Sequence, residues 1–301
     1  MKKSRKKQVS EGNAQGQARI NWFPGHMAKA LRGVRDKIGM VDLVLEIRDA
    51  RVPLSSGNPA IEKHLKQKPR LIVFNKTNLA DKSDIRLWKD WFSRRSDPFL
   101  FVDAFSEKSL KVLSKMARKA MEGKWQKFIR KGINPPPLRM MLLGIPNTGK
   151  STIINRLTKR RATNIGDRPG VTRSQEWIVL GKDLELLDTP GIMPPRIETE
   201  EQGLWLCAIH AIKDEIVGKE KVATFVISHL QQNPTSEFLQ RYNVNDAGPL
   251  FPQELIISIG TQLNFLRKGG EVDYMKTCGH ILNDYRQGLL GSCSFERPPK
   301  E

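Results

Sequence analysis

Short apolar runs and segments with helical periodicity alternate along the first two thirds of the chain. Runs rich in Val, Leu, Ile and Phe predict buried strands at 41–48, 71–74, 99–102 and 140–143. Between and after them, apolar residues at helical spacing predict helices at 58–66, 84–92, 110–128 and 152–157. Strands that alternate with helices are typical of an α/β fold with a doubly wound, parallel sheet.

The pattern changes after a predicted hairpin. Residues 177–180 and 184–187 read as two antiparallel strands joined by a short turn. Beyond Pro194 and Pro195 the strand signal fades, and helices are predicted at 203–217, 221–231, 254–266 and 274–286. We therefore expect an α/β domain at 20–195 and a small all-helical domain at 196–301.

A phosphate-binding loop follows the strand at 140–143. The segment from Gly144 to Ser151 matches the pattern G-x-x-x-x-G-K-[ST] and opens a predicted helix, which is the context that the pattern requires. Glycines let backbone N–H groups point at phosphates, Lys150 reaches the outer phosphates and Ser151 ligates Mg²⁺. The expected phosphate contacts are Asn147, Thr148, Gly149, Lys150, Ser151 and Thr152.

Two downstream segments complete a metal and γ-phosphate site. The strand at 184–187 runs into Asp188-Thr-Pro-Gly191, where Asp188 can hold Mg²⁺ through water and the Gly191 N–H can meet the γ-phosphate. Between this segment and the phosphate loop lies 166–172, whose Thr172 offers a second hydroxyl ligand. The predicted Mg²⁺ ligands are thus Ser151, Thr172 and Asp188.

A base-reading loop lies upstream of the phosphate loop. Asn75-Lys76-Thr77-Asn78 follows a strand and resembles the Asn-Lys-x-Asp motif with which GTPases read guanine. The next strand ends in Asp103-Ala104, which resembles the loop that supports the base. In ordinary GTPases these motifs follow the phosphate loop. Here they precede it, so the order is circularly permuted, and a sheet can still close because strands pair in space.

Asn78 departs from the guanine motif. An Asn carbonyl accepts one guanine N–H, whereas its NH₂ faces another donor, and the same amide complements xanthine. Relative to Asp at this position, Asn78 is expected to weaken guanine binding by about 1.5–3 kcal/mol, roughly ten- to a hundredfold in affinity. Asp81 is an alternative acceptor if the loop shifts.

Positive charge is concentrated in the same two thirds of the chain. Lys and Arg number 51 against 32 Asp and Glu, a net charge of +19, and the segment from His210 onward is nearly neutral. Residues 1–19 read as a disordered basic arm, and 108–139 carry many basic residues and one acid. In that second cluster Lys111, Lys115 and Lys119 line one helix face. A solvated amphipathic helix gives the same pattern, but unbalanced like charges also favour contact with RNA phosphates.

Composition excludes several classes of protein. No apolar run approaches the ~20 residues that span a bilayer, and the basic helix lacks the aromatics of a membrane-bound face. Three widely spaced cysteines argue against a disulfide framework, and no Cys/His spacing suggests zinc. The start has neither an apolar signal region nor an import pattern. We expect a cytoplasmic protein of bacterial type rather than an organellar relative.

The permuted order resembles the YlqF/RbgA family of ribosome-biogenesis GTPases. Further motifs that carry the resemblance are Trp22-Phe-Pro-Gly-His-Met27, Asp49-Ala-Arg-Val-Pro53, Gly166-Asp-Arg-Pro-Gly170 and Ser294-Phe-Glu-Arg-Pro298. The resemblance covers about 20–298. It implies a circularly permuted GTPase domain and a helical C-terminal domain that helps to bind rRNA. It implies a monomer, not bound to a membrane, that acts on precursors of the large ribosomal subunit and is stimulated by them.

The resemblance also implies how GTP is hydrolysed. Ile192 stands where Ras-like GTPases have the Gln that orients the attacking water. The family's candidate for that role is the His of the Trp-Phe-Pro-Gly-His motif, here His26, which we expect in a Gly/Pro-shaped loop. The alternative is that His26 packs or caps. Asn147 is similar to the Asn that ligates K⁺ in potassium-stimulated GTPases, unless its side chain merely faces solvent.

Two functions from different classes remain. One is a GTP-hydrolysing assembly factor acting in late maturation of the large ribosomal subunit, with Mg²⁺ as cofactor and K⁺ as a stimulating ion. The other is a nucleotide-gated RNA-binding module whose hydrolysis is incidental. Turnover that rises with subunit precursors distinguishes the first from the second.

Overall fold

The computed structural model describes residues 25–65, 68–158, 177–180, 183–194, 196–244 and 250–300, without the side chains at 25, 26 and 28. The expected basic arm and Thr172 lie outside this part of the chain. No helix within it is long and apolar enough to cross a membrane.

A six-stranded sheet forms the centre of the described α/β region, in the order β3-β2-β1-β4-β6-β5. The strands are β1 (Leu43–Asp49), β2 (Arg70–Asn75), β3 (Phe99–Phe101), β4 (Leu138–Leu143), β5 (Trp177–Leu180) and β6 (Leu184–Leu187). All neighbours are parallel except β5 and β6, which pair antiparallel. The predicted strands and the predicted hairpin are therefore confirmed.

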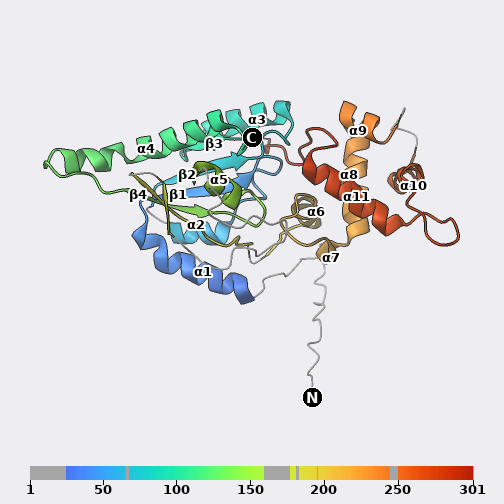
Figure 1. Cartoon of the computed structure of the whole chain (residues 1–301), viewed down its shortest axis with the longest axis horizontal. Coiled ribbons are helices and arrows are strands. Elements are labelled where there is room, and N and C mark those ends of the chain that lie inside the picture. The colour runs from blue at the N-terminus through green and yellow to red at the C-terminus, as the bar shows by residue number, and fades with distance from the viewer. Residues whose placement is uncertain are drawn as a thin grey trace, which may run out of the picture.

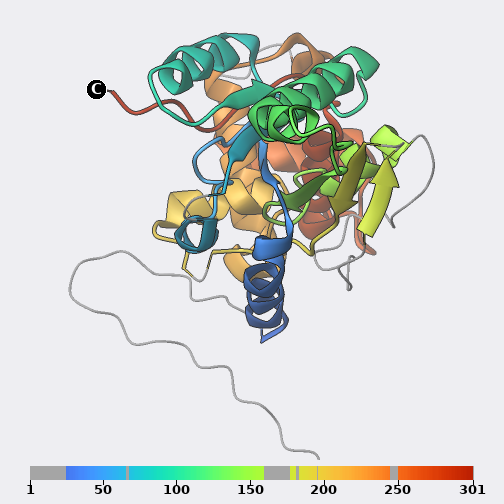
Figure 2. The same ribbon diagram turned by 90° about the vertical axis from the view of Figure 1, so that its left-hand side faces the viewer.

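Helices cover both faces of this sheet (Figures 1 and 2). On one face, α4 (Glu107–Ile129) and α5 (Lys150–Thr158) pack against the side of β1 that carries Leu43, Leu45 and Ile47. On the other face, α1 (Gly25–Lys37) and α2 (Pro59–Leu65) pack around Val44, and α3 (Lys82–Ser93) packs around Phe74. Successive side chains of β1 point to opposite faces of the sheet, and the helices bury both faces, as expected of a central parallel strand.

Helix α1 was not predicted, and it changes the setting of His26. The backbone at 26 lies in the first turn of α1 and not in a loop, so that expectation was wrong. The apolar residues Met27, Leu31 and Val34 lie at helical spacing and face inward. A short 3₁₀ helix (Ile38–Met40) then leads into β1.

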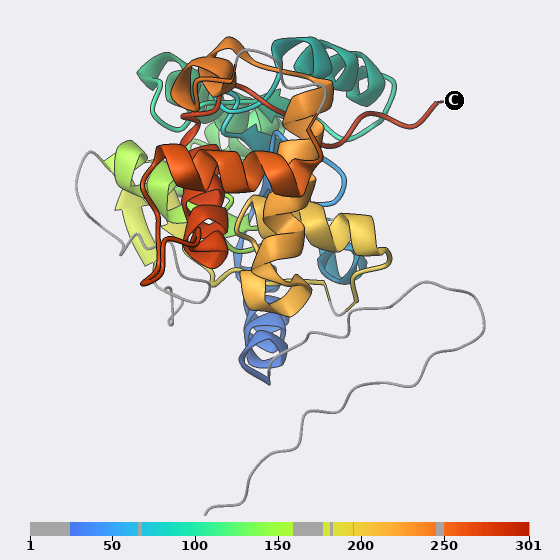
Figure 3. The ribbon, with the colours of Figure 1, turned by 90° about the vertical axis from the view of Figure 1, so that its right-hand side faces the viewer.

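Helices gather at one end of the molecule after residue 199 (Figures 1 and 3). They are α6 (Glu200–Ala208), α7 (Asp214–Val217), α8 (Lys219–Gln232), α9 (Ser236–Arg241), α10 (Pro252–Gln262) and α11 (Tyr274–Gln287). Their buried faces form one cluster, which also takes in Ile145 and Met193 from the α/β region. The two regions therefore share a continuous apolar core.

The single helix expected at 203–217 is broken into α6 and α7. The guanidinium of Arg286, from α11, donates to the carbonyls of Cys207 (2.8 Å) and Ala208 (3.1 Å) at the end of α6. The same group pairs with Asp214 in α7, at 2.5 Å. Because Arg286 satisfies carbonyls that a helix end leaves unpaired, α6 ends here at little cost.

The last described residues return to the α/β region. The carboxylate of Glu296 accepts hydrogen bonds from the backbone N–H groups of Leu54 (2.7 Å) and Ser55 (3.1 Å), and the Trp88 indole donates to the Glu296 carbonyl at 3.0 Å. Arg297 pairs with Asp84 at 3.1 Å. The segment 292–297, which we call the C-terminal strap, thereby ties the helical region to α3 and to the loop after β1.

Candidate nucleotide-binding site

The predicted base, phosphate and metal residues within the described part of the chain come from loops at one edge of the sheet. β2 leads into Asn75 and Lys76, and β3 leads into Asp103 and Ala104. β4 leads into the phosphate loop, and β6 leads into Asp188. Ligands of open α/β sheets bind outside the carboxyl ends of the strands. Residues far apart in sequence are thereby placed around one edge.

Asn75 joins the base loop to the other two loops. Its side-chain nitrogen donates to the carbonyl of Thr148 at 2.8 Å, and its side-chain oxygen accepts from the N–H of Ala104 at 3.1 Å. A Cβ at position 149 would lie 2.2 Å from the Asn75 nitrogen, and Gly149 has a φ of 93°. Only glycine therefore allows the phosphate loop to approach Asn75 this closely.

Lys150 is buried at the start of α5. Its ammonium donates to the carbonyls of Ile145 (2.8 Å) and Gly144 (3.2 Å) inside the phosphate loop. Burial lowers the pKa of Lys150 to about 8, although the nearby carboxylate of Asp188 acts in the opposite direction. An anion bound in the loop would favour the charged form of this lysine.

The donor set next to Lys150 fits Mg²⁺. Ser151 follows Lys150 in the first turn of α5, and Asp188 is 2 % exposed at the end of β6. Hydroxyl and carboxylate oxygens are the hard ligands that Mg²⁺ takes alongside water and phosphate. With the metal bound, such a site neutralises charge on the phosphates.

Lys76 spans the distance from the base loop to the phosphate loop. It has a φ of 65°, unusual for a residue with a side chain. Its ammonium donates to the carbonyl of Asn147 and forms an ion pair with Asp49, whose carboxylate oxygen lies 3.1 Å away. The aliphatic part of Lys76 thus runs along the edge where a base is expected.

Asp81 does not stand in for Asn78. The Asp81 carboxylate caps α3, accepting from the N–H groups of Ser83 (2.7 Å) and Asp84 (3.1 Å). These bonds hold its pKa below the ordinary value in spite of partial burial. Asn78 itself is exposed, and its carbonyl accepts from the Ser292 hydroxyl of the C-terminal strap at 3.2 Å.

The segment after Asp188 lies against the phosphate loop. The Ile192 N–H donates to the carbonyl of Gly144 at 3.1 Å, and a Cβ at Gly191 would lie 2.7 Å from Pro146. The carbonyl of Ile192 accepts from the side-chain nitrogen of Asn58 at 2.7 Å. Asn58, from the loop after β1, therefore fixes the residue that follows Gly191.

The start of α1 belongs to the same region. Met27, 1 % exposed, lies in the buried cluster that contains Ile145 of the phosphate loop and Met193 of the segment after Gly191. The backbone of His26 immediately precedes Met27 in α1. His26 thus lies at the start of a helix whose buried side chains share apolar clusters with the phosphate loop and with the segment after Gly191.

The helical region also contacts the phosphate loop directly. The side-chain nitrogen of Asn147 donates to the carbonyl of His210 at 2.7 Å, in the turn between α6 and α7. Both residues have positive φ, 60° and 63°. The amide of Asn147, expected to ligate K⁺, is therefore oriented by the helical region.

The basic face of α4 lies apart from this edge. Lys111, Lys115 and Lys119 are exposed, and none of them forms an ion pair with a residue that the structure describes. Their neighbours Arg118 and Lys124 do, with Asp183 and Asp42. The three lysines thus form an unbalanced basic stripe.

Three contacts at the site were not anticipated: those of Asp49, Asn58 and the His210 carbonyl. Asp49 ends a buried strand, which is where parallel sheets carry functional side chains, so its position was a usable signal. Asn58 bonds a residue 134 positions away in the sequence, and His210 accepts its bond through a backbone carbonyl. Nothing local in the sequence marks either of these two contacts.

Comparison with known proteins places these features among ribosome-associated GTPases. A family model described as a 50S ribosome-binding GTPase matches residues 139–251. The ribosome biogenesis GTPase A of Bacillus licheniformis is 42% identical over 282 residues, covering 93% of this chain and 98% of that protein. The mitochondrial ribosome-associated GTPase 1 of Mus musculus is 31% identical over 303 residues, covering 94% and 92%.

A solved structure shares the fold. The crystal structure of GNP-bound YlqF from T. maritima superposes with a TM-score of 0.63 at 24% identity, over 89% of this chain and 98% of that one. The GDP-bound YlqF structure gives a TM-score of 0.61 at 25% identity, over 89% and 99%. The architecture of sheet and C-terminal helices is therefore common to both proteins.

Proposed function

Because the chain belongs to the family of ribosome biogenesis GTPase A, the YlqF/RbgA family, we propose that it hydrolyses GTP as an assembly factor in late maturation of the large ribosomal subunit. The observation that carries this proposal is the meeting of base loop, support loop, phosphate loop and Asp188 at one sheet edge. Each loop comes from a different strand, in the permuted order of the circularly permuted GTPases.

We assign the base to Asn75, Lys76, Asn78, Asp103 and Ala104. Asn75 holds the loops together, the Lys76 stem covers one face of the base and Asn78 meets its edge. The link from Asn75 to Thr148 supports this assignment, because it couples the base loop to the phosphate loop. The Ala104 N–H, which we assign to the guanine carbonyl, donates to the Asn75 side-chain oxygen at 3.1 Å, and this bond joins the support loop to the base loop.

The phosphates and the metal are assigned to the opposite side of the site. Asn147, Thr148, Gly149, Lys150, Ser151, Thr152 and Gly191 contact phosphate oxygens, and Ser151, Thr172 and Asp188 hold Mg²⁺. The buried Lys150 regains full charge when a polyphosphate replaces its present carbonyl partners. Its ammonium then stabilises the charge that develops as the γ-phosphate leaves.

We propose His26 as the catalytic residue that positions the attacking water. Ile192 cannot hydrogen-bond a water, and the cluster around Met27 holds α1 next to the segment that carries Ile192. Asn147 is the proposed K⁺ ligand, and its orientation by the His210 carbonyl supports a fixed amide at that place. A cation bound there would add positive charge beside the phosphates.

We propose that rRNA of the subunit precursor contacts the helical domain at 196–301 and the stripe of Lys111, Lys115 and Lys119. The exposure of the stripe, and its lack of acidic partners among the described residues, support phosphate contacts. We infer a monomer in the cytoplasm of a bacterial cell, in keeping with the Bacillus relatives.

The test is GTP turnover of the purified chain with and without large-subunit precursor particles, in K⁺ and in Na⁺. An assembly factor shows turnover that rises with particle concentration and is faster in K⁺. Turnover that ignores the particles, together with particle binding that depends on the nucleotide, would instead establish an RNA-binding module with incidental hydrolysis.

A further inference from the structure

The Asp49-Ala-Arg-Val-Pro segment has no role in the site as assigned above, yet it lies at the centre of that site. β1 pairs with β2 on one side and with β4 on the other, so its carboxyl end lies between the base loop and the phosphate loop. Asp49 is the last residue of β1 and is in register with Asn75. Its carboxylate is entirely buried.

Two cations share this carboxylate. One oxygen of Asp49 lies 3.1 Å from the Lys76 ammonium and 2.9 Å from a terminal nitrogen of Arg51. The other oxygen accepts from Nε of Arg51 at 2.9 Å and from its backbone N–H at 3.1 Å. The Asp49 N–H in turn donates to the Ser56 hydroxyl at 3.0 Å. The carboxylate is thus held by several bonds before it meets Lys76.

The same group is braced by the helical region. The Arg51 guanidinium is 1 % exposed and lies over the ring of Tyr285 in α11, 5.2 Å from its centroid. The Arg51 carbonyl accepts from the N–H of Phe295 in the C-terminal strap at 3.1 Å. Burial alone would raise the pKa of Asp49, but Arg51 and Lys76 hold it well below its ordinary range. The carboxylate therefore stays ionised.

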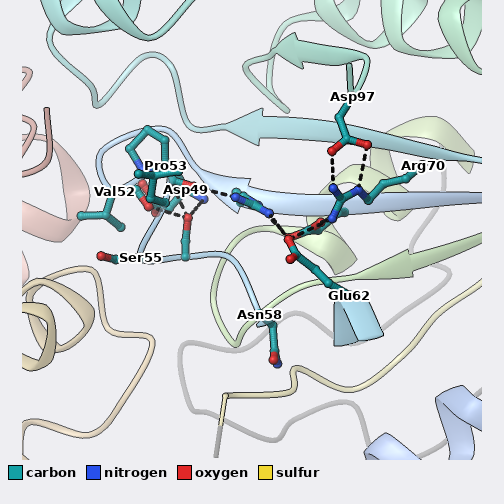
Figure 4. Close-up of polar contacts among 12 residues, drawn as sticks. Asp49, Val52, Pro53, Ser55, Asn58, Glu62, Arg70 and Asp97 are labelled. Atoms are coloured by element: carbon teal, nitrogen blue, oxygen red, sulfur yellow. Dashed lines mark hydrogen bonds and ion pairs between the residues drawn. The ribbon is translucent and has the colours of Figure 1, made fainter. Parts of the chain in front are cut away.

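A second network, buried at Arg48 and Glu46, fixes the loop that follows Asp49 (Figure 4). Arg48 bonds Glu46 at 2.7 Å, Glu62 at 3.2 Å and the carbonyl of Pro53 at 3.3 Å. Figure 4 shows Arg70 between Asp97 and Glu62 at the far end of this network. A Cβ at Gly57 would lie 2.7 Å from the Arg48 guanidinium. The loop therefore has little freedom to move Asp49.

We propose that Asp49 is a positioning residue of the nucleotide site, which holds the Lys76 ammonium so that the lysine stem lies along the base. The inference rests on the base-covering role proposed for Lys76. Lys76 has the backbone geometry of a constrained residue, and its side chain is 23% exposed. The Asn147 carbonyl also accepts from its ammonium, but that carbonyl is neutral, so Asp49 supplies the negative charge that holds the ammonium here. Arg51 and Tyr285 make the helical region part of this support.

A purely structural ion pair, which closes the turn after β1, is the alternative. Both the positioning role and the structural role predict a less stable protein when Asp49 is replaced, so the free energy of unfolding does not distinguish them. They differ in coupling: a positioning role acts on the nucleotide only through Lys76, whereas a structural role is independent of Lys76. A double-mutant cycle measures that difference directly.

The experiment titrates a fluorescent N-methylanthraniloyl derivative of GDP against the full chain and its variants. Asp49→Asn and Lys76→Met are each expected to weaken affinity about tenfold, and the double variant also about tenfold, because the two changes remove one interaction. Asp42→Asn is the matched control: it alters a carboxylate just before the opposite end of β1, which accepts from the Arg139 N–H at 3.0 Å, and it should leave affinity unchanged.

A further variant guards against misfolding. Asp49→Asn leaves the buried Arg51 uncompensated, so Asp49→Asn/Arg51→Met, which removes both buried charges, is expected to fold and to bind like Asp49→Asn. Arg51→Met alone keeps the anion beside Lys76 and should lose less than threefold.

Losses that multiply to about a hundredfold in the double variant, or wild-type affinity in Asp49→Asn, would overturn the positioning role. Wild-type affinity in Lys76→Met would overturn the base assignment itself, and with it this inference.

Discussion

Replacing Asn78 with Asp tests the nucleotide specificity of this site. Asn78 is exposed at the end of the base loop, so a new carboxylate there has no desolvation cost before the nucleotide binds. The loop is anchored on the far side, because the carbonyls of Asn78 and Leu79 accept from the Ser292 hydroxyl (3.2 Å) and the Cys293 N–H (3.0 Å) of the C-terminal strap. The substitution thus changes the base-facing group without releasing the loop.

The expected gain follows from counting donors. Guanine presents two N–H groups to this position, of which an Asn carbonyl accepts one and a carboxylate accepts both. A hydrogen bond to a charged group contributes about 1.5–3 kcal/mol. Because Asp81 is occupied as the cap of α3, it does not already supply the missing acceptor. Asn78→Asp should therefore tighten GDP and GTP binding by about ten- to a hundredfold.

The assay is a titration of GDP and of xanthosine diphosphate against wild type and Asn78→Asp. Xanthine has a carbonyl where guanine has its amino group, so the variant should bind the xanthine nucleotide more weakly as it gains guanine affinity. Thr77→Asp places the same charge one residue earlier and should not reproduce the exchange. Equal GDP affinity in wild type and Asn78→Asp would refute this account and leave recognition to Lys76 and Ala104.

Lys150→Ala should abolish GTP hydrolysis by removing a phosphate contact, and undiminished turnover in the purified variant would contradict the phosphate-loop assignment. The pKa of Lys150 is about 8, so this lysine loses its proton above that pH in the nucleotide-free chain. GDP binding should therefore weaken as the pH rises above about 8, and the proton taken up on binding is measurable by calorimetry in buffers of different ionisation heat. GDP affinity that stays constant from pH 7 to 9.5 would argue against a charged Lys150 as the phosphate contact. His26→Ala should keep nucleotide affinity and lower particle-stimulated kcat by about 10²–10⁴, whereas lost affinity with unchanged kcat would make His26 structural. Neutralising Lys111, Lys115 and Lys119 together should flatten the salt dependence of particle binding, each phosphate contact contributing a log–log slope of about −0.9 or less on RNA; an unchanged slope means that the stripe is only solvated.

Features encoded in short stretches of sequence were predictable here. The phosphate loop is specified by glycines and a lysine at fixed spacing, and β1, β2 and β4 by runs rich in Leu, Ile, Val and Met that suit strands buried on both faces. The meeting of the base loop and the phosphate loop also followed, because carboxyl ends of parallel strands share one edge. The spacing of Met27, Leu31 and Val34 contained the signal for α1, but the Pro-Gly pair before it favoured a loop.

Features that depend on distant partners were not predictable. The break between α6 and α7 exists because Arg286, from α11, satisfies the carbonyls of Cys207 and Ala208. The availability of Asp81 was left open by the sequence, since only the start of α3 shows that its carboxylate is a cap. Glu296 finds its partners at Leu54 and Ser55, more than two hundred residues away. In each case a polar group forms its hydrogen bonds or caps a helix only once the chain has folded, and no local sequence pattern predicts that partner.

The helical region and the C-terminal strap contact the phosphate loop, the base loop and the loop after β1, and this has a thermodynamic consequence. The turn at His210 holds the phosphate loop through Asn147, the strap holds the base loop, and Tyr285 lies under Arg51 beside Asp49. A nucleotide that shifts any of these loops must therefore shift the helical region or strain its contacts. If GTP and GDP differ in that shift, they differ in affinity for whatever the helical region binds. Linkage then requires that a bound particle change the ratio of GTP to GDP affinity by the same factor. This reciprocity applies to binding free energies, whereas the turnover rate depends on the groups that touch the γ-phosphate.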